Sequence, residues 1–307
     1  MTAPADLSRL TLGTAPDSWG VWFPEDAHQV TWRQYLDELP QAGYVWTELG
    51  PQGFLPQDPA QLRDELERRG LKVCGGTVFA SLHQGKEALD KAKEEFGREA
   101  RLLREVGAKY LVHLPTQYTD MHTGAATEGA DLGQDDWSSL VQGTNELARY
   151  LLEEFGVELV FHPHVDTHVD TQRFIDKFLD DTDPEFVSLC LDTGHVEYCS
   201  GDNRDIISRH PDRISYIHLK QVNPRVAAQA REERVGFYEA VPRGAMVEPP
   251  LGAPAMQPLL DDLAALNRDM RLIIEQDMYP APVGSAKAIA ARTRNYFTSL
   301  GLPPAED

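Results

Sequence analysis

The run Val157-Glu158-Leu159-Val160-Phe161 ends at His162-Pro163-His164, and three later runs repeat this design. Those runs are Leu189-Cys190-Leu191 before Asp192, Tyr216-Ile217 before His218, and Leu272-Ile273-Ile274 before Glu275. Each run is short and apolar, as in a strand buried on both faces, and each stops at a residue that can bind a metal. The repetition predicts a parallel sheet whose strand ends assemble one site.

Short apolar runs alternate with amphipathic stretches along the whole chain. We expect strands at residues 10–15, 44–49, 71–79, 109–114, 157–162, 187–192, 213–219 and 271–275, each followed by a helix. Eight strand-helix pairs in 307 residues predict an α/β fold, a (β/α)₈ TIM barrel, in a single domain over residues 1–307 with its core at about 10–300. A doubly wound sheet would need a glycine-rich phosphate loop, and Gly75-Gly76 does not fit G-x-G-x-x-G.

The expected loops differ in length at the two ends of the barrel. Helix-to-strand turns are short, as at Gly43, Gly70 and Gly156, whereas the strand-to-helix loops at 115–134 and 221–254 are long. Active sites of (β/α)₈ barrels lie on the strand-to-helix side, and long loops there form walls or lids. We therefore expect the functional site at that end.

Charge and composition argue against several classes of protein. A formal net charge of −20 would repel a phosphate backbone, so nucleic acid is not an expected partner. No apolar run approaches the ~18 residues of a membrane helix, and the N-terminus lacks the layout of a signal peptide, so we expect a cytoplasmic protein that does not contact a membrane. The three cysteines predict no disulfide framework.

Histidine and carboxylate positions predict a metal centre. The clearest pattern is the quartet His162, Asp192, His218 and Glu275, which ends the last four expected strands. Nitrogen and carboxylate donors without thiolate suit Mn²⁺, Co²⁺, Zn²⁺, Fe²⁺ or Mg²⁺. A polar cap on one strand needs no metal, but four such caps at one barrel mouth favour a metal site.

Other polar residues near the quartet are candidates for proton transfer. His164 and Lys220 each lie two residues after a predicted ligand and share its strand face, and His195 lies three residues after Asp192. We predict four catalytic residues: Glu275, His164, His195 and Lys220.

Substrate contacts are expected from the earlier strands. Glu48 ends the second strand, and Trp19 and Trp22 lie near the barrel mouth, where aromatic rings can pack against a sugar. Together with His113 of the fourth strand, they are our predicted substrate-binding residues. Asp17 is expected to orient its loop, and Asp277 is a candidate without an assigned role.

Six motifs carry a resemblance to a known family. They are Ala15-Pro16-Asp17-Ser18-Trp19-Gly20-Val21-Trp22, Trp46-Thr47-Glu48-Leu49-Gly50-Pro51, Gly75-Gly76-Thr77-Val78-Phe79, His162-Pro163-His164, Leu191-Asp192-Thr193-Gly194-His195 and His218-Leu219-Lys220. Together they resemble the xylose isomerase-like TIM barrels, and the first three resemble the inosose dehydratases of that superfamily.

The resemblance implies a metal-dependent lyase of inositol catabolism. In the superfamily Glu, Asp, His and Glu from strands five to eight hold a metal; Asp192, His218 and Glu275 match the last three, and His162 stands at the expected Glu. Epimerases exchange protons through two glutamates, so this histidine disfavours them, whereas His-x-His is similar to the dehydratases. We expect a hydro-lyase that uses Mn²⁺ or Co²⁺ to eliminate water from a keto-cyclitol or keto-sugar through a metal-stabilised enolate.

Three other functions stay open on the sequence alone. They are a metal-dependent ketose 3-epimerase or isomerase, a lyase that cleaves 3-keto-glycosides, and a non-enzymatic sugar-binding module. The family also suggests a homo-oligomer.

Overall fold

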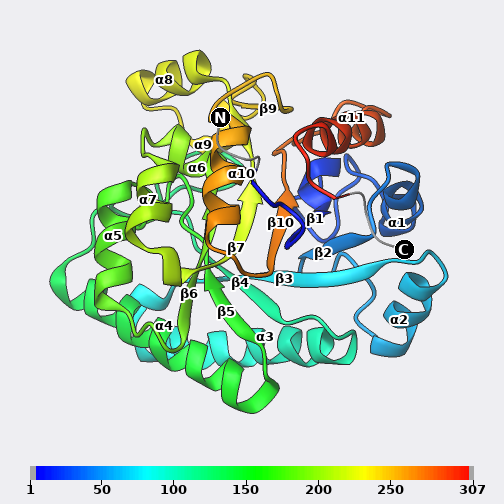
Figure 1. Ribbon diagram of the computed structural model, residues 1–307. Helices are drawn as coiled ribbons and strands as arrows, with labels where there is room; N and C mark the ends of the chain where they lie inside the picture. The colour runs from blue at the N-terminus through cyan, green and yellow to red at the C-terminus, as the bar shows by residue number, and fades with distance from the viewer. Residues whose placement is uncertain (1–4, 304–307) are drawn as a thin grey trace.

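The computed structural model describes residues 5–303. Eight strands close into a barrel in the order β1-β10-β7-β6-β5-β4-β3-β2, with every adjacent pair parallel (Figure 1). The strands are β1 (Leu10–Thr14), β2 (Trp46–Pro51), β3 (Lys72–Ala80), β4 (Tyr110–Pro115), β5 (Glu158–Phe161), β6 (Val187–Asp192), β7 (Ile214–Leu219) and β10 (Met270–Ile274). The predicted (β/α)₈ barrel is confirmed.

Helices surround the barrel and connect consecutive strands (Figure 1). They are α1 (Trp32–Gln41), α2 (Pro59–Glu67), α3 (Lys86–Glu105), α4 (Gln134–Phe155), α5 (Gln172–Asp181), α7 (Asn203–Arg209), α10 (Met256–Ala265) and α11 (Ala286–Ser299). Thr31 and Asp58 start α1 and α2 because their side chains accept the N–H groups of Gln34 and Gln61. Within residues 5–303 no helix is long and apolar enough to cross a bilayer.

Several short elements occupy regions that the sequence suggested were loops. They are η1 (Pro16–Trp19), η2 (Leu82–Gln84), α6 (Thr193–Tyr198) and η3 (Pro211–Arg213). The long segment after β7 contains α8 (Pro224–Glu233) and α9 (Phe237–Ala240) between two short antiparallel strands, β8 (Gln221–Val222) and β9 (Met246–Val247). Because this segment buries its own apolar cluster, including Val222, Phe237 and Met246, it forms an ordered wall.

Apolar side chains pack in two separate layers. The main core lies between the strands and the surrounding helices. A smaller cluster fills the inside of the barrel and consists of Ala15, Cys74, Val112, Val160, Cys190, Tyr216 and Ile273. This inner cluster forms an apolar floor beneath the carboxyl ends of the strands.

Candidate active site

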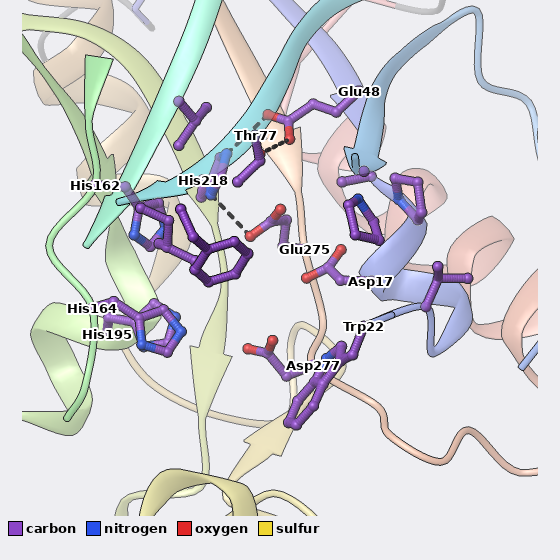
Figure 2. A pocket seen from close by; sticks show the side chains of 18 of the residues that line it. Asp17, Trp22, Glu48, Thr77, His162, His164, His195, His218, Glu275 and Asp277 are labelled. Atoms are coloured by element: carbon purple, nitrogen blue, oxygen red, sulfur yellow. Dashed lines mark hydrogen bonds and ion pairs between the residues drawn. The ribbon is translucent and has the colours of Figure 1, made fainter. Parts of the chain in front are cut away.

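Strand alternation brings the four predicted metal ligands together. Each lies two residues after a residue of the apolar floor and therefore faces the interior one level above it. The pairs are Val160 with His162, Cys190 with Asp192, Tyr216 with His218, and Ile273 with Glu275. All four side chains are buried, and Figure 2 shows His162, His218 and Glu275 directed into the same space.

The donor atoms of this quartet lie within reach of a single ion. Asp192 Oδ2 lies 3.3 Å from His162 Nε2 and 3.7 Å from His218 Nδ1, which lies 2.9 Å from Glu275 Oε2. One donor atom from each residue falls within 4.8 Å of the others. Asp192 Oδ2 and His218 Nδ1 are buried and make no hydrogen bond to any described residue. A cation would compensate these acceptors, so the residues fit a divalent metal.

Two of the predicted ligands, Asp192 and His218, are held in place by hydrogen bonds to residues outside the quartet. Asp192 Oδ1 accepts the backbone N–H groups of Gly194 and His195 at 2.8 and 2.9 Å, which caps α6 and leaves Oδ2 for the site. Glu48 Oε1 lies 3.0 Å from His218 Nε2 (Figure 2). A carboxylate accepts, so His218 donates from Nε2 and presents the Nδ1 lone pair to the quartet. Glu48 therefore orients a ligand from the opposite side of the barrel.

Lys220 places a buried positive charge among the carboxylates. Its Nζ lies 3.2 Å from Asp192 Oδ2, 3.2 Å from Glu275 Oε2 and 2.8 Å from Asp277 Oδ2. Burial alone would lower the pKa of Lys220, but these carboxylates raise it well above its usual value, so the ammonium stays charged. The methylene chain of Lys220 packs directly against Gly194, where an added Cβ would lie only 2.6 Å from Lys220 Cγ. A residue larger than glycine would therefore displace Lys220.

The other two predicted catalytic residues, His164 and His195, line the cavity beside the quartet, with ring centroids 3.8 Å apart. His195 Nε2 lies 3.3 Å from Lys220 Nζ and accepts from it, because an ammonium only donates. His164 Nδ1 lies 2.7 Å from the carbonyl oxygen of Val165 and donates to it, which leaves Nε2 as the acceptor. Burial, with His162 and Lys220 nearby, lowers the pKa of His164 to about 3, so its ring is neutral.

The segment that follows β1, together with strands β2 and β3, forms the opposite wall of the cavity. Asp17, Trp22, Glu48 and Thr77 line it there (Figure 2). Burial and the charge of Glu275 raise the pKa of Asp17 well above its usual value, so its carboxyl is neutral. Trp22 stacks on Tyr279 with centroids 5.2 Å apart. The cavity measures about 790 Å³ together with its opening to solvent.

Two residues that were expected to bind substrate lie outside the cavity. Trp19 is fully buried, and its Nε1 donates to Glu38 at 2.8 Å. His113 lies between the rings of Phe96 and Phe161, and burial lowers its pKa to about 4. Both neighbours of His113 in β4, Val112 and Leu114, line the cavity, so strand alternation turns His113 toward the helices. Both predictions were wrong.

Some cavity residues were not predicted. Asp277 had no assigned role, although it lies two residues after Glu275 and the spacing signals the same face. Phe237 and Tyr238 reach the cavity from α9, and Met121 reaches it from the loop after β4. No local sequence pattern marks these three, because they reach the cavity through the folding of long loops.

Sequence comparison places the chain among known proteins. The family model described as xylose isomerase-like TIM barrel matches residues 36–296. An inosose dehydratase of Geobacillus kaustophilus is 32% identical over 295 residues, which cover 94% of each chain. An inosose dehydratase of Geobacillus thermodenitrificans is 30% identical over 294 residues, covering 94% of this chain and 97% of the relative.

Solved structures share the fold at low sequence identity. The IOLI protein with a bound zinc atom has a TM-score of 0.73 at 15% identity, covering 97% of this chain and 99% of that protein. The probable 3-DHS dehydratase AsbF of Bacillus anthracis has a TM-score of 0.70 at 14% identity, covering 94% and 98%. The D-allulose 3-epimerase of Methylomonas sp. has a TM-score of 0.68 at 17% identity, covering 97% and 99%. By its sequence match and its closed parallel barrel, the chain belongs to the xylose isomerase-like TIM barrel family.

Proposed function

We propose that this chain is a divalent-metal-dependent hydro-lyase that removes water from a keto-cyclitol, with an inosose as substrate. The observation that carries the proposal is the convergence of four buried metal-capable side chains, three of which (His162, His218 and Glu275) line one cavity. The inosose dehydratase relatives, which align along almost the whole chain, support this substrate class. A site of this construction suits an enzyme better than a sugar-binding module, because sugar binding alone does not require such a set of donors.

His162, Asp192, His218 and Glu275 would hold the metal, which supplies polarisation of a ketone oxygen and so acidifies the adjacent C–H. Lys220 keeps its proton and adds positive charge beside the same ketone, where negative charge develops.

Proton transfer falls to side chains on opposite walls of the cavity. We assign protonation of the departing β-hydroxyl to Asp17, because its buried carboxyl is neutral and faces the cavity. The carbon-bound proton goes to His164, whose neutral ring lies on the other wall (Figure 2). Glu275 and His195 contact Lys220 and orient it.

The decisive experiment supplies 2-keto-myo-inositol to protein that has been stripped with a chelator and reloaded with Mn²⁺, Co²⁺ or Zn²⁺. We expect a product lighter by one water, seen by mass spectrometry, only with the reloaded protein. Unchanged substrate with every metal would reject the substrate. Incorporation of solvent deuterium without loss of water would instead identify an epimerase or isomerase.

A lyase that cleaves 3-keto-glycosides is the second candidate. A neighbouring cavity of about 670 Å³ shares Trp22, Pro51, Thr77, Phe79 and Met121 with the main one. Such an extension would accommodate a leaving group larger than water. Release of an aromatic aglycone from a 3-keto-glucoside, measured by chromatography, would establish this activity.

We also propose Mn²⁺ or Co²⁺ as the native ion, a role in inositol catabolism, a cytoplasmic location and a homo-oligomeric state. Metal analysis of protein purified without added metal tests the first. Growth of a deletion strain on myo-inositol, cell fractionation and light scattering test the others.

A further inference from the structure

A second cluster of histidine and carboxylate side chains lies where three strand-to-helix loops meet. His83 comes from η2 after β3, Glu128 from the loop after β4, and His168 from the loop after β5. Glu128 bridges the two rings, with Oε2 3.2 Å from His83 Nε2 and Oε1 3.3 Å from His168 Nε2. The ring centroids lie 4.6 Å apart. None of these residues lines the cavity described above.

The hydrogen bonding of His168 leaves two acceptors facing each other, its Nε2 and the Glu128 carboxylate. His168 Nδ1 lies 2.9 Å from the carbonyl oxygen of Ala130, and a carbonyl only accepts, so Nδ1 carries a hydrogen. In the neutral ring, Nε2 then presents a lone pair, and this lone pair faces the Glu128 carboxylate, which also only accepts. Either a cation or an additional proton must lie between them.

The surroundings favour a metal cation. A histidine that binds a metal commonly donates its other N–H to a backbone carbonyl, as His168 does to Ala130. The His83 and His168 side chains are only 7% and 3% exposed, so an imidazolium here would lose most of its hydration. The Glu128 side chain is 31% exposed, which lets water complete the coordination. One donor atom from each residue lies within 4.8 Å of the others.

We propose that His83, Glu128 and His168 bind a second divalent cation, of which Zn²⁺ best suits two imidazoles and one carboxylate. This ion would fasten the loop after β4 to the loops after β3 and β5. The same loop carries Gln117 and Met121 into the main cavity. The second ion therefore positions a wall of the cavity without contacting the substrate.

Zinc stoichiometry tests the proposal. Full-length protein is stripped with a chelator, titrated with ZnCl₂ against a chromophoric chelator, and compared with its variants. We expect two ions per chain for the unchanged protein and one each for Glu128→Gln, His168→Ala and His218→Ala. The double variant Glu128→Gln/His218→Ala should bind none. The control His122→Ala, an exposed residue of the same loop, should still bind two.

The outcomes separate the two sites from each other and from misfolding. Glu128→Gln preserves the side-chain shape, so its folding is checked by circular dichroism and by retention of the ion that His218→Ala loses. If His218→Ala binds no zinc while Glu128→Gln binds as much as the unchanged protein, a proton occupies the second cluster and the proposal is wrong. If only Glu128→Gln loses an ion, the second site stands and the proposed metal centre of the active site fails.

Cobalt spectra supply a further readout. Co²⁺ bound to His218→Ala should show visible d–d absorption that disappears in the double variant. Absorption that survives in the double variant would place the ion elsewhere and overturn the assignment.

Discussion

The two halves of the barrel treat buried carboxyl groups differently. At the quartet in the second half, burial opposes ionisation of Asp192 and Glu275, but Lys220 and the adjacent histidines prevail and lower both pKa values, whereas burial prevails at Asp277 beyond the quartet. In the first half, burial prevails and raises the pKa values of Asp17 and Glu99. The quartet thus presents anions suited to a cation, and across the cavity Asp17 presents a carboxyl whose raised pKa suits it to donate a proton.

The largest effect is expected from removing a donor in the second half. His218→Ala should lower turnover of the keto-cyclitol by about 10³-fold or more, because the ion supplies several kcal/mol of charge stabilisation. Steady-state kinetics measures the loss of turnover, and metal analysis measures the loss of the bound ion. His28→Ala, at an exposed histidine, is the control. If His218→Ala retains full activity, the second half of the barrel does not hold a metal that catalysis requires.

The next test addresses the neutral acid of the first half. Asp17→Asn should lower turnover by about 10²- to 10³-fold, the usual contribution of general acid catalysis, while the metal content stays unchanged. The exposed Asp135→Asn on α4 serves as the control. If Asp17→Asn retains full turnover, Asp17 is not the proton donor and the first half of the barrel only lines the cavity.

A smaller effect is expected at Gly194, which makes room for the side chain of Lys220. Gly194→Ala would bring its Cβ against the stem of Lys220 and displace the ammonium from the carboxylates. We expect turnover to fall by about 10- to 100-fold, as for other changes that shift residues around a metal, with the ion retained. Gly133→Ala is matched, because its added Cβ would meet only Asp136 Oδ2 at an ordinary contact distance of 3.7 Å. Equal kinetics for the two variants would contradict this positioning role.

The smallest effect on catalysis is expected at Glu99, which lies outside the barrel on α3. Burial raises its pKa from 4.5 to about 7, and Gln52 donates to it at 3.2 Å. The neutral carboxyl is favoured in the folded state, so its ionisation removes stability as pH rises from about 4.5 through about 7. Glu99→Gln should therefore be more stable than the unchanged protein at pH 8, by up to about 3 kcal/mol, with unchanged turnover.

Guanidinium unfolding at two pH values checks this sign. The stabilisation by Glu99→Gln should nearly vanish at about pH 4, below the ordinary pKa of 4.5, where the carboxyl is mostly neutral in the unfolded as well as the folded state. The exposed Glu94→Gln on the same helix should change little at either pH. If Glu99→Gln raises the free energy of unfolding equally at both pH values, ionisation of Glu99 is not the cause of the stabilisation.

The barrel was predictable because each strand is a local signal. Apolar runs of four to six residues fix the strands, and capping residues such as Thr31 fix the helix starts, so the expected ranges agree with the structure to within about two residues. The convergence of His162, Asp192, His218 and Glu275 follows from two-residue alternation above the apolar floor. Their roles in metal binding remain predictions.

The errors at His113 and Trp19 and the unpredicted contact of Phe237 have separate causes. Nearness to a strand end does not by itself place a side chain in the cavity: alternation turns His113 away, because its apolar neighbours Val112 and Leu114 both face inward. Trp19 is turned away because η1 begins directly after β1 and buries its ring. Phe237 reaches the cavity because the chain after β7 folds against itself, and such tertiary contacts leave no periodic trace.

The capping of α6 by Asp192 has a consequence for ion selectivity. Since two backbone N–H groups occupy Oδ1, the carboxylate cannot turn both oxygens toward an ion and would bind the proposed metal through Oδ2 alone. Calcium favours six to eight oxygen ligands and often takes carboxylates through both oxygens, whereas the smaller transition ions accept fewer donors and nitrogen. One helix cap would thus make the proposed site discriminate against Ca²⁺, the divalent ion that a cluster of carboxylates would otherwise attract.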